Sequence, residues 1–237
     1  MNYFTYNGHN SSEYGLVIEH SPEYGIPERY VERIEVPGRN GDLVIDYGVF
    51  ANVDQVYHVY FDGRSSSFAA KAQAAAQWLM SSRGYMRLED TYDTTTYRMA
   101  MINQSETMNN FMNKLGRFDV VFTCKPQRFL KTGETETTLT IGNTGQTVTN
   151  NYMPCYPIFK LTGNGTLQVN GNYITVANNS GTVIWIDCEA QNAYNGITNM
   201  NNKITLDGEF PFLKSGTNIV KVTGFSAAKM VPRWWTV

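Results

Sequence analysis

The chain has 237 residues, a formal net charge of −2 at pH 7 and only 17% charged side chains, against roughly 25% in average proteins. Neither half carries the clustered Lys and Arg that bind nucleic acid, and no apolar run reaches the roughly 18 residues of a membrane span. The N-terminus lacks the basic and apolar regions of a secretory signal, so we expect synthesis in a cytoplasm and no membrane insertion. Low charge fits a protein that buries its surface against partners. It fits equally a β-rich domain covered in Ser, Thr and Asn.

The first half of the sequence is typical of short strands separated by Gly, Asn and Asp turns. Strands are predicted over residues 3–6, 16–19, 30–36, 43–47, 55–61, 86–88, 97–102 and 116–125. The last is the clearest, because Phe118, Val120 and Phe122 alternate with Asp119 and Val121, a period-two pattern with one apolar face. The dipeptide Lys125-Pro126 is expected to end it.

The segment 36–43, Val-Pro-Gly-Arg-Asn-Gly-Asp-Leu, predicts a tight turn between two strands. Asn40 and Gly41 both take positive φ at low cost, as a two-residue type I′ turn requires. Pro37 fixes φ just before them and removes a backbone donor. The sequence therefore predicts a β-hairpin here.

One segment breaks the β pattern and predicts the only substantial helix, over residues 68–82. It is rich in Ala, Gln, Leu and Met, which are mostly strong helix formers. Phe68, Ala72, Ala75 and Leu79 form an apolar stripe at helical spacing. The serines at 65–67 offer N-caps, and Gly84 is placed to close the helix in a left-handed conformation.

Composition changes near residue 130, where the almost wholly polar run 133–138 leads into a half rich in Asn, Thr and Gly. We place a boundary at about 128–135, which gives an N-terminal domain at 1–130 and a C-terminal domain at 131–237. A long connection within one domain is the alternative.

Short strands at close spacing in the second half favour a sandwich or jelly roll. Asn170-Gly171 gives a second hairpin signal, whereas Gly163-Asn164-Gly165 is interpreted as a hairpin turn because no helix follows it to bind a phosphate. Strands are predicted over residues 137–141, 156–161, 166–169, 173–176, 183–188, 216–224 and 227–231.

Candidate metal and redox residues lack the spacing that such sites need. Cys124, Cys155 and Cys188 have no metal-ligand spacing and are expected to be buried free thiols. The three histidines, His9, His20 and His58, are distant in sequence and are expected to be solvated or structural. The sequence predicts no catalytic residue, no metal site and no cofactor.

Carboxylates could still form the active site of a hydrolase, because the paired carboxylates of such sites have no sequence motif. Asp187 and Glu189 lie two apart on a predicted strand and would face one side; a solvated strand end is the simpler interpretation. The run 89–93, Glu-Asp-Thr-Tyr-Asp, departs from the calcium-loop pattern and is read as an acidic turn.

Three tryptophans raise the possibility of a carbohydrate-binding module. Trp185, Trp234 and Trp235 could form an aromatic platform for a sugar, although aromatic residues in a β domain are more often core. Fold alone does not assign such a function.

Taken in order, several segments resemble the siphophage distal tail protein (Dit) family. The opening segment resembles the first strand and the Ser-x-x-x-Gly-Leu start of that family, and residues 118–126 match its F-x-V-x-F-x-C-K-P ending. The segments that carry the resemblance are 4–16, 36–42, the helix end Trp78-Leu79, 84–90 and 118–126, with looser matches at 185–187, 208–213 and 216–219.

The resemblance implies a mainly β chain: an N-terminal β-sheet domain with one α-helix and a β-hairpin, followed by a C-terminal galectin-like β-sandwich. It implies a structural virion protein of the phage tail tip or baseplate and no enzyme. Relatives form hexameric rings, or two stacked rings, through their N-terminal domains; they mostly come from phages of Gram-positive hosts.

Such a ring joins the tail tube protein to the tail-tip proteins, lets DNA and the tape-measure protein pass its lumen, and in some phages holds receptor-binding proteins. We expect the hairpin and its neighbouring strands to contribute ring contacts, a prediction placed on Pro37, Gly38, Arg39, Asn40, Gly41 and Asp42. The alternative function is a carbohydrate-binding module that contacts the host cell wall.

Overall fold

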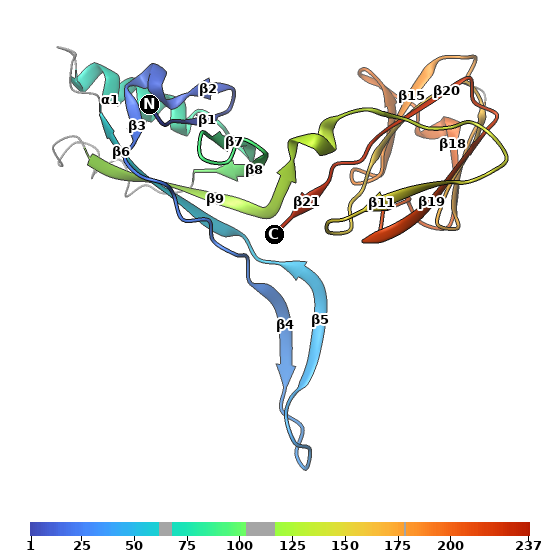
Figure 1. Cartoon of the computed structure of the whole chain (residues 1–237), viewed down its shortest axis with the longest axis horizontal. Coiled ribbons are helices and arrows are strands. Elements are labelled where there is room, and N and C mark those ends of the chain that lie inside the picture. Colours follow the sequence, from blue (N-terminus) through green and yellow to red (C-terminus); the bar gives the residue numbers. More distant parts are fainter. Residues whose placement is uncertain (62–67, 103–116, 178) are drawn as a thin grey trace. The chain divides into compact units, whose positions relative to one another are not determined.

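A computed structural model describes residues 1–61, 68–102, 117–177 and 179–237. The chain divides into two compact units, one formed by Met1–Arg128 with Val237 and the other by Phe129–Thr236. Each unit has its own hydrophobic core, and both are built mainly from strands (Figure 1). The predicted mainly β fold is therefore confirmed.

The first unit is built around one large sheet of long and short strands, in the order β2-β1-β7-β8-β9-β6-β3. One α-helix, α1 (Phe68–Met80), and a short 3₁₀ helix, η1 (Ser11–Tyr14), accompany it in the described residues. Its strands are β1 (Phe4–Tyr6), β2 (His9–Asn10), β3 (Leu16–Ile18), β6 (Val53–Phe61), β7 (Met86–Asp90), β8 (Thr96–Met101) and β9 (Arg117–Leu130).

Helix α1 covers one face of this sheet because its small side chains let it lie close. Ala72, Ala75 and Trp78 are buried, and the Trp78 indole stacks on Tyr14 with ring centroids 4.4 Å apart. Its Nε1 donates to the carbonyl oxygen of Tyr6 at 3.2 Å. The sheet contributes the alternating apolar residues of β6 and β9 to the same core, as the period-two pattern predicts.

Two predicted boundaries in this unit are wrong. The helix ends at Met80, where the Ser81 amide and hydroxyl both bond to the Trp78 carbonyl; Gly84 lies beyond it and does not take positive φ. Strand β9 runs through Pro126 to Leu130. Its ladder with β6 ends at Cys124, so the missing N–H of Pro126 removes no bond from that ladder. The predicted N-cap serines lie outside the described residues.

A separate two-stranded sheet, β4 (Arg29–Ile34) with β5 (Leu43–Phe50), completes the first unit and projects away from the larger sheet (Figure 1).

The second unit is a sandwich of two antiparallel sheets, ordered β10-β20-β12-β15-β16-β17 and β11-β19-β13-β14-β18. Its core is formed by the inward side chains of both sheets, among them Phe159, Ile184 and Val222. Its elements are β10 (Thr137–Thr138), β11 (Gln146–Asn150), β12 (Ile158–Thr162), β13 (Gly165–Val169), β14 (Asn172–Val176), β15 (Val183–Asp187), β16 (Asn192–Asn195), β17 (Thr198–Asn199), β18 (Ile204–Asp207), β19 (Gly216–Thr223), β20 (Ala227–Val231), β21 (Trp235–Thr236), η2 (Lys131–Glu134) and η3 (Asn201–Lys203).

Turn chemistry explains one connection in the sandwich and corrects another. Asn170 and Gly171 take φ of 52° and 100° between β13 and β14, as the type I′ prediction requires. Gly163-Asn164-Gly165 is not a hairpin turn, because it links β12 in one sheet to β13 in the other.

Among the described helices, none has the length and apolar character needed to cross a membrane.

Candidate assembly surface

The β4–β5 hairpin is the most exposed apolar feature of the first unit. Its strands pair from Ile34 opposite Leu43 down to Arg29 opposite Phe50, with a register shift between Arg29 and Val31. Every residue from 32 to 49 is exposed. A two-stranded hairpin is marginally stable at best in water, so this hairpin gains little from its own core.

The hairpin tip differs from the predicted type I′ turn. The Arg39 amide donates to the Val36 carbonyl at 3.1 Å, and Gly38 takes φ of 84°. Pro followed by Gly at the two central positions of a four-residue turn is the pattern of type II. Asn40 is not in the left-handed region, whereas Gly41 has φ of 76°. The prediction was wrong because the strands stop at residues 34 and 43, which leaves room for a wider loop.

The two faces of the hairpin differ in chemistry, because side chains alternate along each strand. Cross-strand register places Ile34 with Leu43, and Glu32 with Ile45, on one face; the Tyr30 and Tyr47 rings, 5.4 Å apart, lie on it too. We call this the apolar face, and its large apolar side chains are Tyr30, Ile34, Leu43, Ile45 and Tyr47. Their exposed fractions run from 38% to 62%, and a cluster of that size marks an interaction site.

Two polar contacts join the strands of the hairpin, one of them on the apolar face. Arg29 Nη1 lies 2.6 Å from Asp46 Oδ2, and the Tyr47 hydroxyl donates to Glu32 Oε2 at 2.6 Å. The Gly48 amide and Arg29 hold the pKa of Asp46 below its usual value. Because these groups are exposed, each contact stabilises the hairpin only modestly.

The segment that leads into the hairpin is fixed by a polar network on the first unit. The Tyr24 hydroxyl lies 3.0 Å from each carboxylate oxygen of Asp90, and the Tyr57 hydroxyl donates to Asp90 Oδ2 at 2.8 Å. Arg98 Nη2 donates to the Gly25 carbonyl at 3.2 Å, and Gln55 Nε2 to the Glu23 carbonyl at 3.0 Å. Burial and the Asp90 charge raise the pKa of both tyrosines.

Asp93 and Arg128 extend this network. Burial alone would raise the pKa of Asp93, but hydrogen bonds from Thr95, Thr96 and Arg128 outweigh it and hold that pKa well below the usual range. Arg128 Nη2 lies 2.6 Å from Asp93 Oδ2, and its guanidinium sits 4.8 Å from the centre of the Tyr24 ring. Glu89 and Asp90 end strand β7, so the predicted acidic turn begins only after them, where the amides of Tyr92 and Asp93 donate to Asp90 Oδ1.

Replacing Tyr24 with Phe is expected to destabilise the first unit by about 1–2 kcal/mol, because Asp90 loses a hydrogen bond to a charged acceptor. Urea denaturation measures the change. The matched control is Tyr92→Phe, since the Tyr92 hydroxyl bonds the exposed Asn2 side chain and its loss should cost less than about 0.5 kcal/mol. Equal effects of the two substitutions would contradict this role of the network.

The three cysteines are buried free thiols, as predicted. Burial raises the pKa of Cys124 and of Cys155 to about 12 and raises that of Cys188 further.

We therefore expect a thiol reagent at pH 8 to react at least about a thousandfold more slowly with the folded chain than with free cysteine, because the thiolate is the reactive form. All three should react after denaturation. Rapid labelling of any of the three in the native chain would contradict the expectation.

The other clusters of charged side chains described next have partners within the chain. Strand β15 ends at Asp187, so Glu189 lies in the following turn and not on the predicted strand; both carboxylates bond to the Arg233 guanidinium, Asp187 at 2.8 Å. His58 Nδ1 lies 2.5 Å from Asp119, and its ring stacks on His20. Within the described ranges, no group of three or more His, Cys, Asp or Glu side chains could hold a metal ion.

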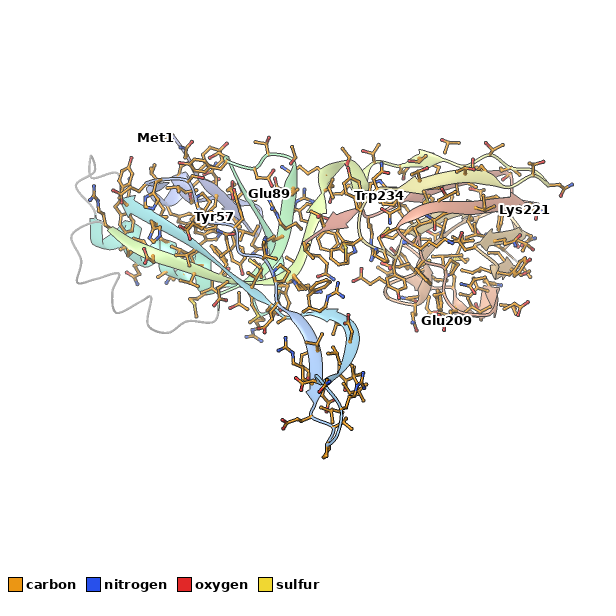
Figure 2. All side chains as sticks on the ribbon, turned by 60° about the horizontal axis from the view of Figure 1, so that its bottom comes forward. Met1, Tyr57, Glu89, Glu209, Lys221 and Trp234 are labelled. Carbon is orange, nitrogen blue, oxygen red and sulfur yellow. The ribbon has the colours of Figure 1, made fainter. Side chains whose placement is uncertain are left out.

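The structure places the three candidate tryptophans in two settings. On the outward side of the six-stranded sheet, Lys160 Nζ lies 4.6 Å from the Trp185 ring centre, and Tyr194, on the opposite neighbouring strand, lies nearly parallel to it at 6.4 Å. Trp234 and Trp235 pack against the sandwich core, where Trp234 is seen in Figure 2. The sugar platform stays a prediction that this geometry does not support, because both faces of Trp185 have neighbours.

This chain matches known proteins in its structure and not in its sequence. No protein family matches the sequence, and no curated protein matches it. The crystal structure of SPP1 Dit (gp 19.1), described as a paradigm of the hub adsorption apparatus in phages that infect Gram-positive bacteria, matches with a TM-score of 0.72 and 10% identity over 97% of each chain. The chain has the fold of the SPP1 Dit protein. The baseplate of phage P2, in its activated conformation with Ca, also matches, with a TM-score of 0.53 and 9% identity over 97% of each chain.

The likeness to Dit spans both units, so it covers the hairpin as well as the sandwich. Sequence alone predicts contacts at the tip, residues 37–42, and in the neighbouring strands. The structure adds which strand face is apolar. The signal was present in the sequence as two period-two series, one through Tyr30 and Ile34 and the other through Leu43, Ile45 and Tyr47.

Proposed function

We propose that this chain is a phage distal tail hub protein, which forms a hexameric ring between the tail tube and the tail tip or baseplate. The single observation that carries the proposal is an exposed apolar hairpin face on a chain with the fold of a Dit hub. Such a face needs a partner, and ring subunits supply one to each other.

The surface is large enough for that role. Taking about 200 Å² for a fully exposed large side chain, near the middle of the range for aromatic residues, the five side chains, which are 38% to 62% exposed, leave on the order of 450 Å². Covered by an equal area of a partner, this approaches the roughly 1,000 Å² that a specific interface needs. A closed ring uses head-to-tail contacts, in which two different surfaces of the chain meet.

The proposed partners are further copies of this chain, the tail tube protein, the tail-tip proteins and, through the second unit, a receptor-binding protein. DNA passes the lumen without specific binding. The protein acts as a structural component of the virion and not as an enzyme. Support comes from the carboxylate pair Asp187 and Glu189, both of which bond to the Arg233 guanidinium.

Hydrogen–deuterium exchange tests the proposal in the whole chain. Amides of residues 29–50 are expected to exchange quickly at dilution and to become at least tenfold more protected as concentration rises and rings form, because the partner excludes water from the hairpin. The sandwich strand β15, paired on both sides, is the internal reference and should not change. Concentration-dependent mass without hairpin protection would overturn the assignment of this surface.

A further inference from the structure

The chain contains five Asn-Gly pairs, and the structure places them in different settings. They are Asn7-Gly8, Asn40-Gly41, Asn164-Gly165, Asn170-Gly171 and Asn195-Gly196. The side-chain amide of an asparagine is open to attack by the next main-chain nitrogen when glycine follows, because glycine has no Cβ to block the approach and bends freely. How firmly the side chain and backbone are held then decides which pair reacts.

The pair Asn40-Gly41 at the hairpin tip is exposed and lies outside every helix and strand. Within the described ranges, neither the Asn40 side chain nor the Gly41 amide makes a hydrogen bond. The bond of the preceding turn joins Arg39 to Val36 and leaves both residues out. A Cβ on Gly41 would meet no atom within 4 Å. Loop tips of this kind move most easily, so nothing opposes ring closure here.

The same dipeptide at Asn170-Gly171 is held on both sides of its amide group. Asn170 Nδ2 donates to Asn218 Oδ1 at 2.7 Å, and Asn170 Oδ1 accepts from the Ile219 amide at 3.0 Å. Attack by the Gly171 nitrogen requires the side chain to leave both partners. That opening is a local unfolding step, which lowers the rate of any reaction that depends on it.

Asn164-Gly165 is restrained as well. Asn164 Oδ1 accepts from the Asn179 amide at 2.8 Å, and Gly165 pairs with Val176 in the sheet. A Cβ on Gly165 would lie 2.2 Å from the Thr223 carbonyl oxygen, so this backbone is closely packed. The two sandwich pairs are therefore internal references for the hairpin pair, with the same dipeptide in a fixed setting.

We propose that Asn40 is a site of spontaneous covalent modification, at which the chain deamidates through a succinimide formed with Gly41. The Gly41 nitrogen bonds to the side-chain carbonyl carbon of Asn40. The carbon–nitrogen bond of the side-chain amide breaks, and its nitrogen leaves as ammonia with the proton lost from the Gly41 amide. Water then opens the ring at either carbonyl, which gives aspartate or isoaspartate. The steps need no enzyme, metal or oxidant.

The product changes the chemistry of the hairpin tip. Over residues 35–42, the carboxylates of Glu35 and Asp42 stand against the guanidinium of Arg39, a net charge of −1. Deamidation adds one further negative charge, and isoaspartate also lengthens the main chain by a methylene group. Because Asn40 is exposed, the fold is expected to survive the change. The inference concerns the single chain and does not rest on the proposed ring.

Mass spectrometry of the whole chain, incubated at mildly alkaline pH and low protein concentration, tests the proposal. Peptic digestion at low pH stops the reaction, and chromatography separates the aspartate and isoaspartate peptides. The rate at Asn40 is expected to exceed the rates at Asn164 and Asn170 by at least about tenfold, because those two must first break hydrogen bonds. Asn7 and Asn195, next to turns closed by paired strands, should fall between.

Two controls separate structure from sequence. In denaturant all five pairs should react at similar rates, because the settings that distinguish them are lost. Asn40→Gln keeps an amide at the tip but would have to close a six-membered ring, which is slower to form. Its tip peptide should show no mass gain over the same incubation.

Three outcomes overturn the inference. Equal rates at Asn40 and Asn170 in the folded chain would mean that the fold does not select the site. An Asn40 that reacts only after denaturation would mean that the tip is held more firmly than its contacts indicate. Aspartate without isoaspartate would mean direct hydrolysis of the side chain and no succinimide. None of these measurements depends on assembly, so each outcome leaves the proposed ring standing.

Discussion

Replacing Ile45 with Glu is expected to abolish ring assembly while leaving the monomer folded. Ile45 is exposed in the single chain, so a carboxylate there is solvated, and its repulsion from Glu32, which lies directly opposite on β4, weakens the hairpin of the monomer by at most about 1 kcal/mol. In the ring the same carboxylate would be buried without a partner, which costs several kcal/mol. A loss of at least about 3 kcal/mol per contact weakens each contact by roughly a hundredfold or more.

Sedimentation velocity measures the loss, and circular dichroism verifies the fold. The control is Val44→Glu, which introduces the same charge one residue away, on the opposite face of β5, where it lies opposite Arg33 instead of Glu32. Its association constant should lie within about threefold of that of the unmodified chain, because an exposed charge contributes little to the free energy of association. If both variants assembled like the parent, the apolar face would not be an interface.

The second large effect concerns the sandwich and follows from a close backbone approach. A Cβ on Gly165 would lie 2.2 Å from the Thr223 carbonyl oxygen and 2.8 Å from the Phe225 ring. Gly165→Ala must therefore push β13 away from β19, two strands that pair in the same sheet. We expect a loss of about 3 kcal/mol in unfolding free energy, at the upper end of overpacking effects.

Gly142→Ala is the matched control, because a Cβ there meets no atom within 4 Å and its φ is not positive. It should change stability by less than about 0.5 kcal/mol. Thermal unfolding followed by tryptophan fluorescence reports on the sandwich. Equal midpoint temperatures of unfolding for the two variants would contradict the prediction, since they would show that β13 and β19 move apart at little cost in free energy.

The contrast between two Asn-Gly pairs shows how far local sequence specifies this fold. Asn170-Gly171 forms the predicted turn because β13 and β14 run right up to it. Asn40-Gly41 does not, because Pro37-Gly38 makes an earlier turn. The same dipeptide thus gives different backbones, depending on where the flanking strands stop.

Long-range pairing accounts for what sequence reasoning missed. Strands β11 and β16 are rich in Asn and Thr and carry little period-two signal, and β18 alternates over four residues only; pairing with neighbours orders them. Tyr24, Tyr57 and Asp90 are far apart in sequence, and only the sheet brings them to one carboxylate. The apolar hairpin face had a local signal, but a strand pattern does not say which face lacks a core.

The most direct test of the account is the mass and shape of the purified chain, by light-scattering chromatography over a range of concentrations and then negative-stain electron microscopy. The account predicts a closed ring of six copies, or two such rings stacked, with a central lumen. Two-fold dimers or open filaments would contradict it, as would single copies at every concentration both alone and mixed with the tail tube protein.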